Sequence, residues 1–162
     1  MKFINPVRTL QGKFTLYLSI LIIGIISILS FLNISREIKL LREAMVKEGK
    51  ALVESLAISC TNTMLYEEIG LVEEGGLLDN YISDLMQRKD LKVLYAMIID
   101  PNGKVVAHNS MIELGSTYHD EITKRVLTSS NTLIQYPSEN VLEISTPLSI
   151  STKRWGTLRV GI

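Results

Sequence analysis

The chain has 162 residues, of which 17 are basic and 17 acidic, so its formal net charge is zero. Once a membrane segment is set aside, this length leaves room for one compact domain and a connecting helix. The neutral balance argues against nucleic acid as a partner. The only bases of the first 33 residues, Lys2, Arg8 and Lys13, lie beside an apolar stretch with no acid among them. This pattern favours contact with membrane lipid headgroups.

The first predicted element is a membrane-spanning helix at residues 14–32. Its sequence, FTLYLSILIIGIISILSFL, contains 19 residues and no charge, and at about 1.5 Å per residue it matches a hydrocarbon layer of roughly 30 Å. A cleaved signal peptide has a shorter apolar core and a small-residue cleavage site, whereas the NISREIKLLRE that follows has no A-x-A pattern. We therefore expect an uncleaved anchor in the plasma membrane, with residues 1–13 in the cytoplasm and the rest of the chain outside it, on the periplasmic or extracellular side.

Residues 33–70 are predicted to form a stalk helix that leads into the next domain. Apolar residues recur along it at helical steps, at Ile34, Ile38, Leu41, Met45, Leu52 and Leu56. The spacing fits a seam between two copies of the chain, and it also fits a face packed on the chain's own domain. We expect a homodimer seam near the membrane and intramolecular packing beyond it. Cys60, the only cysteine, is expected to be a small buried residue of this helix.

Residues 71–162 are predicted to form a domain that contains two helices and five strands. The helices are expected at residues 77–90 and 119–128, and the strands at residues 91–100, 104–109, 132–137, 141–150 and 155–162. Turn sequences separate the strands, with PNG, SEN and the charged TKR as connections. A five-stranded antiparallel sheet with helices on one face buries strands of this number and length, so the predicted fold class is α+β.

Two segments of this domain carry a family resemblance. YAMIIDPNGKVVAHNSMIELG, at residues 95–115, has a strand, a D-x-x-G turn, an A-H strand and a following glycine. ISTPLSISTKRWGTLRVGI, at residues 144–162, has two strands with W-G between them. Both are similar to the single-module, PAS-like Cache family of extracellular sensor domains, and the resemblance covers about residues 34–162. It implies a long membrane-proximal helix, a small-ligand pocket between the sheet and its covering loops, and dimeric signalling across the bilayer.

The resemblance also implies a receptor context. Receptors of this kind usually continue through a second transmembrane helix into an output module, and about 13 cytoplasmic residues are too few to fold a catalytic domain. We therefore expect either the input region of a longer bacterial receptor or a module that acts through a membrane partner. A sensor histidine kinase is the favoured receptor, with a chemotaxis receptor or a diguanylate cyclase as alternatives. No enzymatic activity is expected of the 162 residues themselves.

A ligand pocket needs apolar walls and a few fixed polar groups. The candidate ligand-binding residues are Tyr95, Met97, His108, Tyr118, Tyr136 and Ser145. By strand parity Tyr95 and Met97 share a face, so both line the pocket or both meet a covering helix. The ligand is expected to be a small molecule such as a carboxylate, an amino acid or an amine. Lys124 and Arg125 could reach a ligand carboxylate or face water.

Other chemistry has weaker support in the sequence. His108 and His119 are 11 residues apart with no cysteine or glutamate at ligand spacing, so we expect neither a metal nor a cofactor. His119 is expected to cap or begin the short helix, and Trp155 to pack at the entrance of a strand with its N–H on a carbonyl. No catalytic residue is assigned, because G-x-S-x-G, H-E-x-x-H and phosphate-loop motifs are all missing. The rival interpretations are a membrane-anchored interaction module without a ligand and an extracytoplasmic hydrolase.

Overall fold

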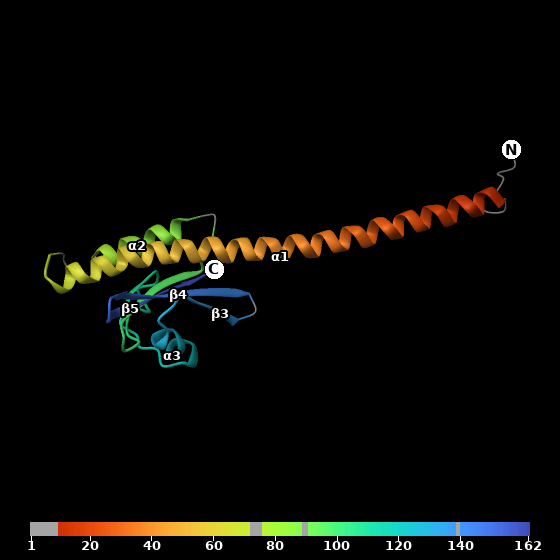
Figure 1. Cartoon of the computed structure of the whole chain (residues 1–162). Helices are drawn as coiled ribbons and strands as arrows, with labels where there is room; N and C mark the ends of the chain where they lie inside the picture. Colours follow the sequence, from red (N-terminus) through yellow and green to blue (C-terminus); the bar gives the residue numbers. More distant parts are fainter. Residues whose placement is uncertain (1–9, 72–75, 89–90, 139) are drawn as a thin grey trace. The chain divides into compact units, whose positions relative to one another are not determined.

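The computed structural model describes residues 10–71, 76–88, 91–138 and 140–162. The chain divides into two compact units, residues 1–44 and 45–162, and each is described by itself. Figure 1 labels the helices α1 (Leu10–Glu68), α2 (Gly76–Gln87) and α3 (Glu121–Thr128), and the strands β1 (Tyr95–Ile99), β2 (Val105–His108), β3 (Leu133–Ser138), β4 (Val141–Ile150) and β5 (Lys153–Gly161). The predictions for Lys2, Arg8, residues 89–90 and Glu139 of the SEN turn lie outside the described residues.

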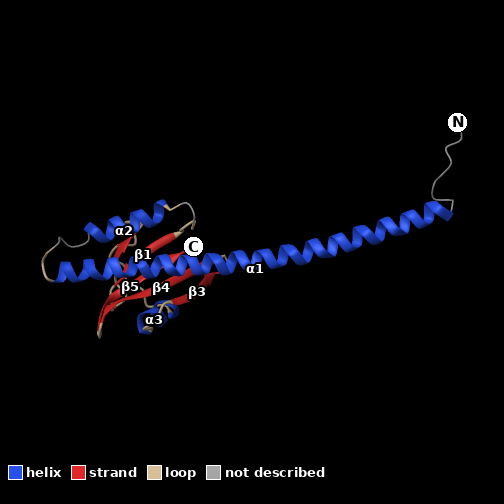
Figure 2. Ribbon diagram, turned by 45° about the horizontal axis from the view of Figure 1, so that its top comes forward, coloured by secondary structure: helices blue, strands red, loops and turns tan. Residues whose placement is uncertain are grey.

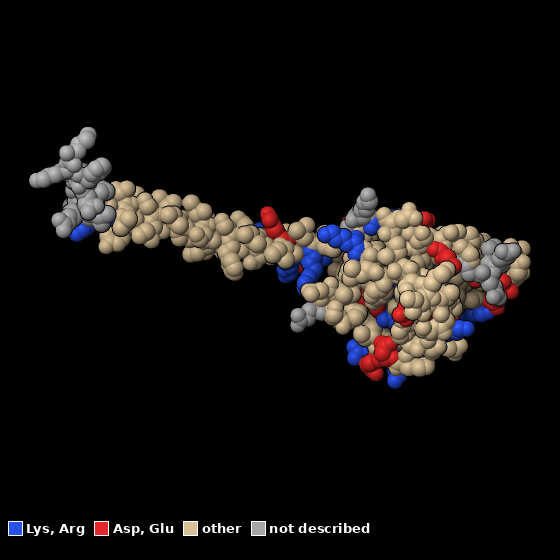
Figure 3. Space-filling view, turned by 180° about the vertical axis from the view of Figure 1, so that it is seen from behind, with Lys and Arg blue, Asp and Glu red and all other residues tan. Residues whose placement is uncertain are grey.

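The first unit contains the beginning of α1 and the predicted membrane segment. In the described part of the chain, this is the one helix long and apolar enough to cross a membrane, with a mean hydropathy of 2.4 over its best 18 residues. None of that window is buried, and Phe14 and Phe31 are 69% and 72% exposed. The uncharged stretch is uniformly tan in Figure 3. A helix that is apolar on all sides and exposed suits a lipid environment, so residues 14–32 are a candidate membrane span.

The second unit is built on a five-stranded antiparallel sheet. Its strand order is β2-β1-β5-β4-β3, and every neighbouring pair is antiparallel. The predicted α+β class and the five strands are therefore confirmed. α1 and α2 cover one face, as predicted, whereas α3 lies on the opposite face (Figures 1 and 2). We call these the α1 face and the α3 face of the sheet.

The α1 face holds the larger part of the core. Its buried side chains come from α1 (Val53, Ala57 and Cys60), from α2 (Leu78, Ile82 and Leu85) and from the sheet (Ala96, Ile98, Ala107, Ile144, Leu148, Leu158 and Val160). The positions in α1 are three or four residues apart and therefore form one helical face. The predicted intramolecular packing of this helix is confirmed, with the partly buried Leu52 and Leu56 at the edge of the contact.

Cys60 is fully buried in this core, as predicted. Desolvation by burial raises the pKa of its thiol to about 12. Because the thiolate is the reactive form, we expect Cys60 in the folded chain to resist iodoacetamide at pH 8 and to be alkylated once urea unfolds the domain. Mass spectrometry of the two reactions measures this difference. Rapid alkylation without urea would show that the end of α1 opens readily from the sheet.

Four local expectations are wrong. The Trp155 N–H donates to the Glu68 carboxylate and not to a carbonyl. α3 is capped by Asp120 and not by His119, because the Asp120 carboxylate accepts the Thr123 backbone N–H at 2.9 Å. Lys153 and Arg154 belong to β5, because only Ser151 and Thr152 form the turn after β4. The sequence also predicts solvated loop positions for four acids, Glu67, Glu68, Glu73 and Glu74. Glu67 and Glu68 instead lie in the last turn of α1, and Glu73 and Glu74 lie outside the described residues.

Candidate functional site

The α3 face of the sheet carries a row of side chains that crosses all five strands. Residues paired directly across antiparallel strands project from the same face. Met97 of β1 pairs with His108 on one side and with Arg159 of β5 on the other. Arg159 pairs in turn with Ser145, and Ser145 with Leu133. The pairing of the strands thus brings polar and apolar side chains from all five strands into one row.

A second row lies beside the first. In it Tyr95 pairs with Gly161, Gly161 with Glu143, and Glu143 with Gln135. The Tyr95 ring occupies the space above Gly161, where an added Cβ would lie 2.2 Å from the nearest ring carbon. Only glycine leaves room for the ring at this position. The absence of a side chain at Gly161 therefore allows Tyr95 to reach across β5 to Glu143.

A buried ion pair joins the two rows. The Arg159 guanidinium donates from Nε to Glu143 Oε1 at 3.0 Å and from Nη2 to Glu143 Oε2 at 2.7 Å. Both residues are nearly inaccessible, with 5% of Arg159 and none of Glu143 exposed. The Ser145 hydroxyl donates to Glu143 Oε1 at 2.9 Å, and the Tyr95 hydroxyl donates to Glu143 Oε2. The carboxylate is therefore held by three different residues of the α3 face.

The same arginine reaches the first turn of α3. Its Nη1 donates to the Thr123 hydroxyl at 2.8 Å, and that hydroxyl donates to the Asp120 carboxylate at 2.7 Å. Desolvation raises the pKa of Asp120, but the bonds from Thr123 and the charge of Arg159 outweigh it and hold that pKa below its usual value. The N-terminus of α3 is thus fixed to the sheet through charged and hydroxyl groups.

Two members of these rows, Tyr95 and His108, have perturbed pKa values. Burial is the first cause of the raised pKa of Tyr95, and its bond to Glu143 adds to it, so the phenol is protonated at neutral pH. Burial lowers the pKa of His108, with a weaker opposing effect from Glu113. Glu113 also accepts the Tyr118 hydroxyl at 2.6 Å. The edge at β2 therefore presents an imidazole, a phenol and a carboxylate.

Four of the six predicted ligand residues come together at this face, and the fifth, His108, pairs with Met97 at its β2 edge. Tyr95, Met97, His108 and Ser145 lie in the two rows, and Tyr118 packs against the cluster formed by Met97, Ile99, Val105 and Val126. Tyr136 does not join them, because it is 56% exposed on β3. Lys124 and Arg125 of α3 are exposed to solvent.

The sequence alone did not single out Glu143 and Thr123, which are central to this arrangement. Glu143 stands two residues before Ser145 on the same strand, so strand parity could have placed it on the same face. Its pairing with Arg159 could not be inferred, because that contact depends on the alignment of β4 with β5.

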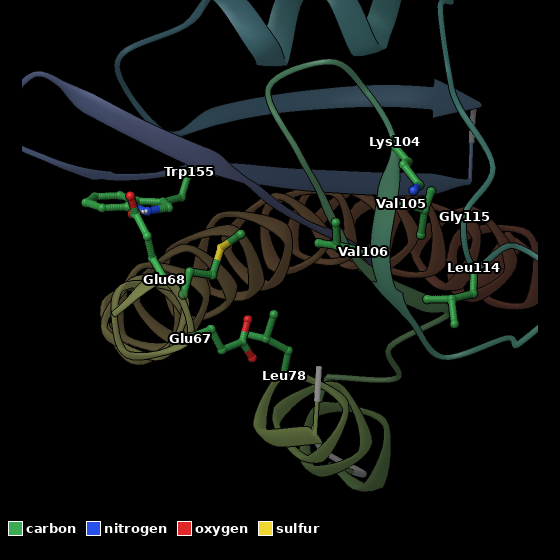
Figure 4. A pocket seen from close by; sticks show the side chains of 10 residues that line it. Glu67, Glu68, Leu78, Lys104, Val105, Val106, Leu114, Gly115 and Trp155 are labelled. Carbon is green, nitrogen blue, oxygen red and sulfur yellow. Dashed lines mark hydrogen bonds between the residues drawn. The ribbon is translucent and has the colours of Figure 1, made fainter. Parts of the chain in front are cut away.

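A cavity also lies beside the ends of α1 and α2. It has a volume of about 500 Å³ and lies between the end of α1, α2, β2 and the start of β5. Figure 4 shows Glu68 and Trp155 together at one side of it and Lys104 and Leu114 at the other. A cavity of about 300 Å³ between α2 and the β2 edge includes His108 in its lining. Among the described residues, no group of three metal-ligating side chains is placed to hold a metal.

Comparison with known proteins places this geometry in context. Residues 38–162 match the family model described as "Single cache domain 3". The crystal structure of the E. coli DcuS sensor domain is similar, with a TM-score of 0.58 and 16% identity over 75% of this chain and 90% of that one. The cofactor-binding GAF domain of the nutrient sensor CodY from Clostridium difficile matches at a TM-score of 0.41 and 18% identity, over 67% and 82% of the two chains. No curated protein sequence matches the chain.

Proposed function

Because the chain belongs to the single Cache sensor domain family, we propose that it senses a small molecule outside the cytoplasm as the input region of a transmembrane receptor. Residues 14–32 would span the membrane and residues 1–13 would lie in the cytoplasm, as the position of the bases suggests. Residues 33–70 would form the stalk and residues 71–162 the sensor. A sensor histidine kinase is the favoured receptor class, and a chemotaxis receptor or a diguanylate cyclase would use the same input.

The exposed apolar residues of the stalk support a homodimer. Ile34, Ile38 and Leu41 are 56%, 61% and 64% exposed in the first unit. Their spacing of four and three residues matches a two-stranded helical seam. In the proposed receptor, ligand binding shifts these helices relative to one another, which requires that the ligand bind one arrangement of the dimer better than the other.

The buried pair of Glu143 and Arg159 is the observation that supports a ligand site on the α3 face. Burying two charges is costly, and a purely structural core of apolar residues is often at least as stable. Here the pair lies beside the Tyr95 phenol, the hydroxyls of Ser145 and Thr123, and the Met97 position paired with Arg159. These are the few oriented polar groups in an apolar setting that a small-molecule site needs.

The chemistry of the pair limits the classes of ligand. A carboxylate would compete with Glu143 for the two-pronged contact to Arg159. An amine would compete with Arg159 for Glu143, beside the rings of Tyr95 and Tyr118. An amino acid could do both. We therefore propose a small carboxylate, amino acid or amine as the ligand and expect no metal or cofactor to be required.

A thermal-unfolding panel tests the proposal. The full chain in lipid nanodiscs would be melted with individual dicarboxylates, amino acids and amines. A ligand present at about 100 times its dissociation constant adds roughly 2.7 kcal/mol to the free energy of unfolding. We expect at least one compound to raise the melting temperature of the chain.

A matched pair of variants assigns any such stabilisation to the α3 face. Ser145→Ala removes the hydroxyl bound to Glu143, and we expect it to weaken the stabilisation. Ser149→Ala, at an exposed position of the same strand, should leave it unchanged. If a ligand stabilised both variants equally, its binding site would lie elsewhere than the α3 face. A panel without any stabilising compound would favour the alternative, a membrane-anchored interaction module that acts through a membrane partner.

A further inference from the structure

The start of β5 contacts helices on both sides of the sheet. β5 pairs Gly156 with Leu148 and Arg154 with Ser149, so Trp155 is an extra residue without a partner on β4. An extra residue of this kind is a β-bulge, which changes the direction of the neighbouring side chains. As a result, Arg154 projects to the α3 face, although it stands an odd number of residues from Arg159.

Arg154 holds the C-terminal end of α3. Its Nη2 donates to the Val126 carbonyl at 2.6 Å and to the Thr157 hydroxyl at 2.6 Å, and its Nη1 donates to the Ser129 carbonyl at 2.8 Å. The last carbonyls of a helix have no partner within the helix and carry partial negative charge, so a guanidinium is a favourable cap. With Arg159 on Thr123, β5 therefore holds α3 at both ends.

The residues on either side of Arg154 hold the end of α1. The Trp155 indole N–H donates to Glu68 Oε2 at 2.6 Å, and the Lys153 ammonium donates to Glu68 Oε1. Lys153 also lies 5.0 Å from the centroid of the Trp155 ring. The hydrogen bond from Lys153 lowers the pKa of Glu68, and the hydrogen bond from Trp155 and the charge of Lys153 add to this effect. The Glu68 carboxylate is therefore ionised at neutral pH. Figure 4 shows Glu68 directed toward the indole of Trp155.

We propose that residues 153–155 couple the ligand face to α1, with Arg154 as the positioning residue for α3 and the Glu68 contact as the link to α1. This inference rests on the proposed function, because it gives the route by which an occupied α3 face would change the helix that leads to the membrane. A ligand at Arg159 or Thr123 displaces the first turn of α3. The short helix moves as a unit, and its last carbonyls then pull on Arg154 and hence on the strand that holds Glu68.

Hydrogen exchange on the full chain in nanodiscs tests this coupling without a ligand. Amides of α3 (residues 121–128) and of the end of α1 (residues 61–68) would be compared with those of β1, which report the stability of the whole sheet. We expect Arg154→Gln to speed exchange in α3 and also in residues 61–68, each roughly two- to tenfold relative to β1, the range for one net hydrogen bond lost. Glu68→Gln should likewise speed exchange in α3, which it does not touch.

The double variant and two further substitutions make the test decisive. In Arg154→Gln/Glu68→Gln the effects on α3 should be smaller than the product of the single effects, because both changes break one connection. Arg125→Gln, on the exposed side of α3, should leave residues 61–68 unchanged. If Arg154→Gln does not fold, Trp155→Phe keeps an aromatic ring but removes the indole donor to Glu68, and it should still change exchange in α3.

Changes confined to the helix next to each substitution would overturn the proposal, as would a uniform increase that includes β1. Either result leaves the ligand site itself untouched. A ligand panel without effect, by contrast, would count against the site and not against the coupling, so the two failures are distinguishable.

Discussion

Replacing Arg159 by leucine should lower the free energy of unfolding by about 3–5 kcal/mol, the largest effect we expect from any single side chain. The reason is that Glu143, which is wholly buried, would keep its charge in the protein interior without its guanidinium partner. The change also removes the donor to the Thr123 hydroxyl and so loosens the first turn of α3.

Urea unfolding followed by the fluorescence of Trp155, the only tryptophan, measures this effect. Arg159→Leu/Glu143→Leu is the informative companion, because it removes both charges and should recover much of the lost stability. Arg125→Leu, which removes an exposed guanidinium, should change stability by less than about 0.5 kcal/mol. If Arg159→Leu were as mild as Arg125→Leu, the buried pair would not be important to the fold.

The fold was predictable because its signals are local. The hydrophobic stretch at residues 14–32, the helical spacing that includes Leu52 and Leu56, and the alternation of β4 each reflect a repeat within one segment. Strand β4 was placed at residues 141–150, as observed. The start of β5 was harder to predict, because its first two residues, Lys153 and Arg154, are charged. Lys153 contacts α1 and Arg154 contacts the end of α3, and neither contact is visible in the sequence.

The candidate site was only partly predictable, for a related reason. Tyr95, Met97 and Ser145 are predictable as aromatic, apolar and hydroxyl residues of strands that could line a pocket. Strand parity puts Tyr95 and Met97 on one face. Glu143 and Arg159 meet because β4 and β5 pair in one register and not another. Register is a property of the folded sheet, and a shift of β4 by one residue against β5 would turn Glu143 to the α1 face and away from Arg159.

Gly161→Ala should destabilise the domain by about 1–3 kcal/mol, because its methyl group would overlap the ring of Tyr95. The added Cβ would lie 2.2, 2.6 and 2.6 Å from three ring atoms, distances that the packed ring cannot accommodate without moving. A displaced ring would also lose its hydroxyl bond to Glu143. We therefore expect weaker ligand stabilisation as well as a lower urea midpoint.

The cause of this effect can be isolated with a double-mutant cycle. In a Tyr95→Ala background the ring is gone, so a further Gly161→Ala change should cost less than about 0.5 kcal/mol. Gly76→Ala is a suitable control, since nothing lies within 4 Å of the added Cβ and alanine is the better helix former. A full destabilisation by Gly161→Ala even without the Tyr95 ring would mean that the backbone of β5, and not the phenol above it, requires glycine. In that case the contact between Tyr95 and Glu143 would not be the reason for glycine at position 161. The space above Gly161 would then no longer account for the position of the Tyr95 ring in the second row.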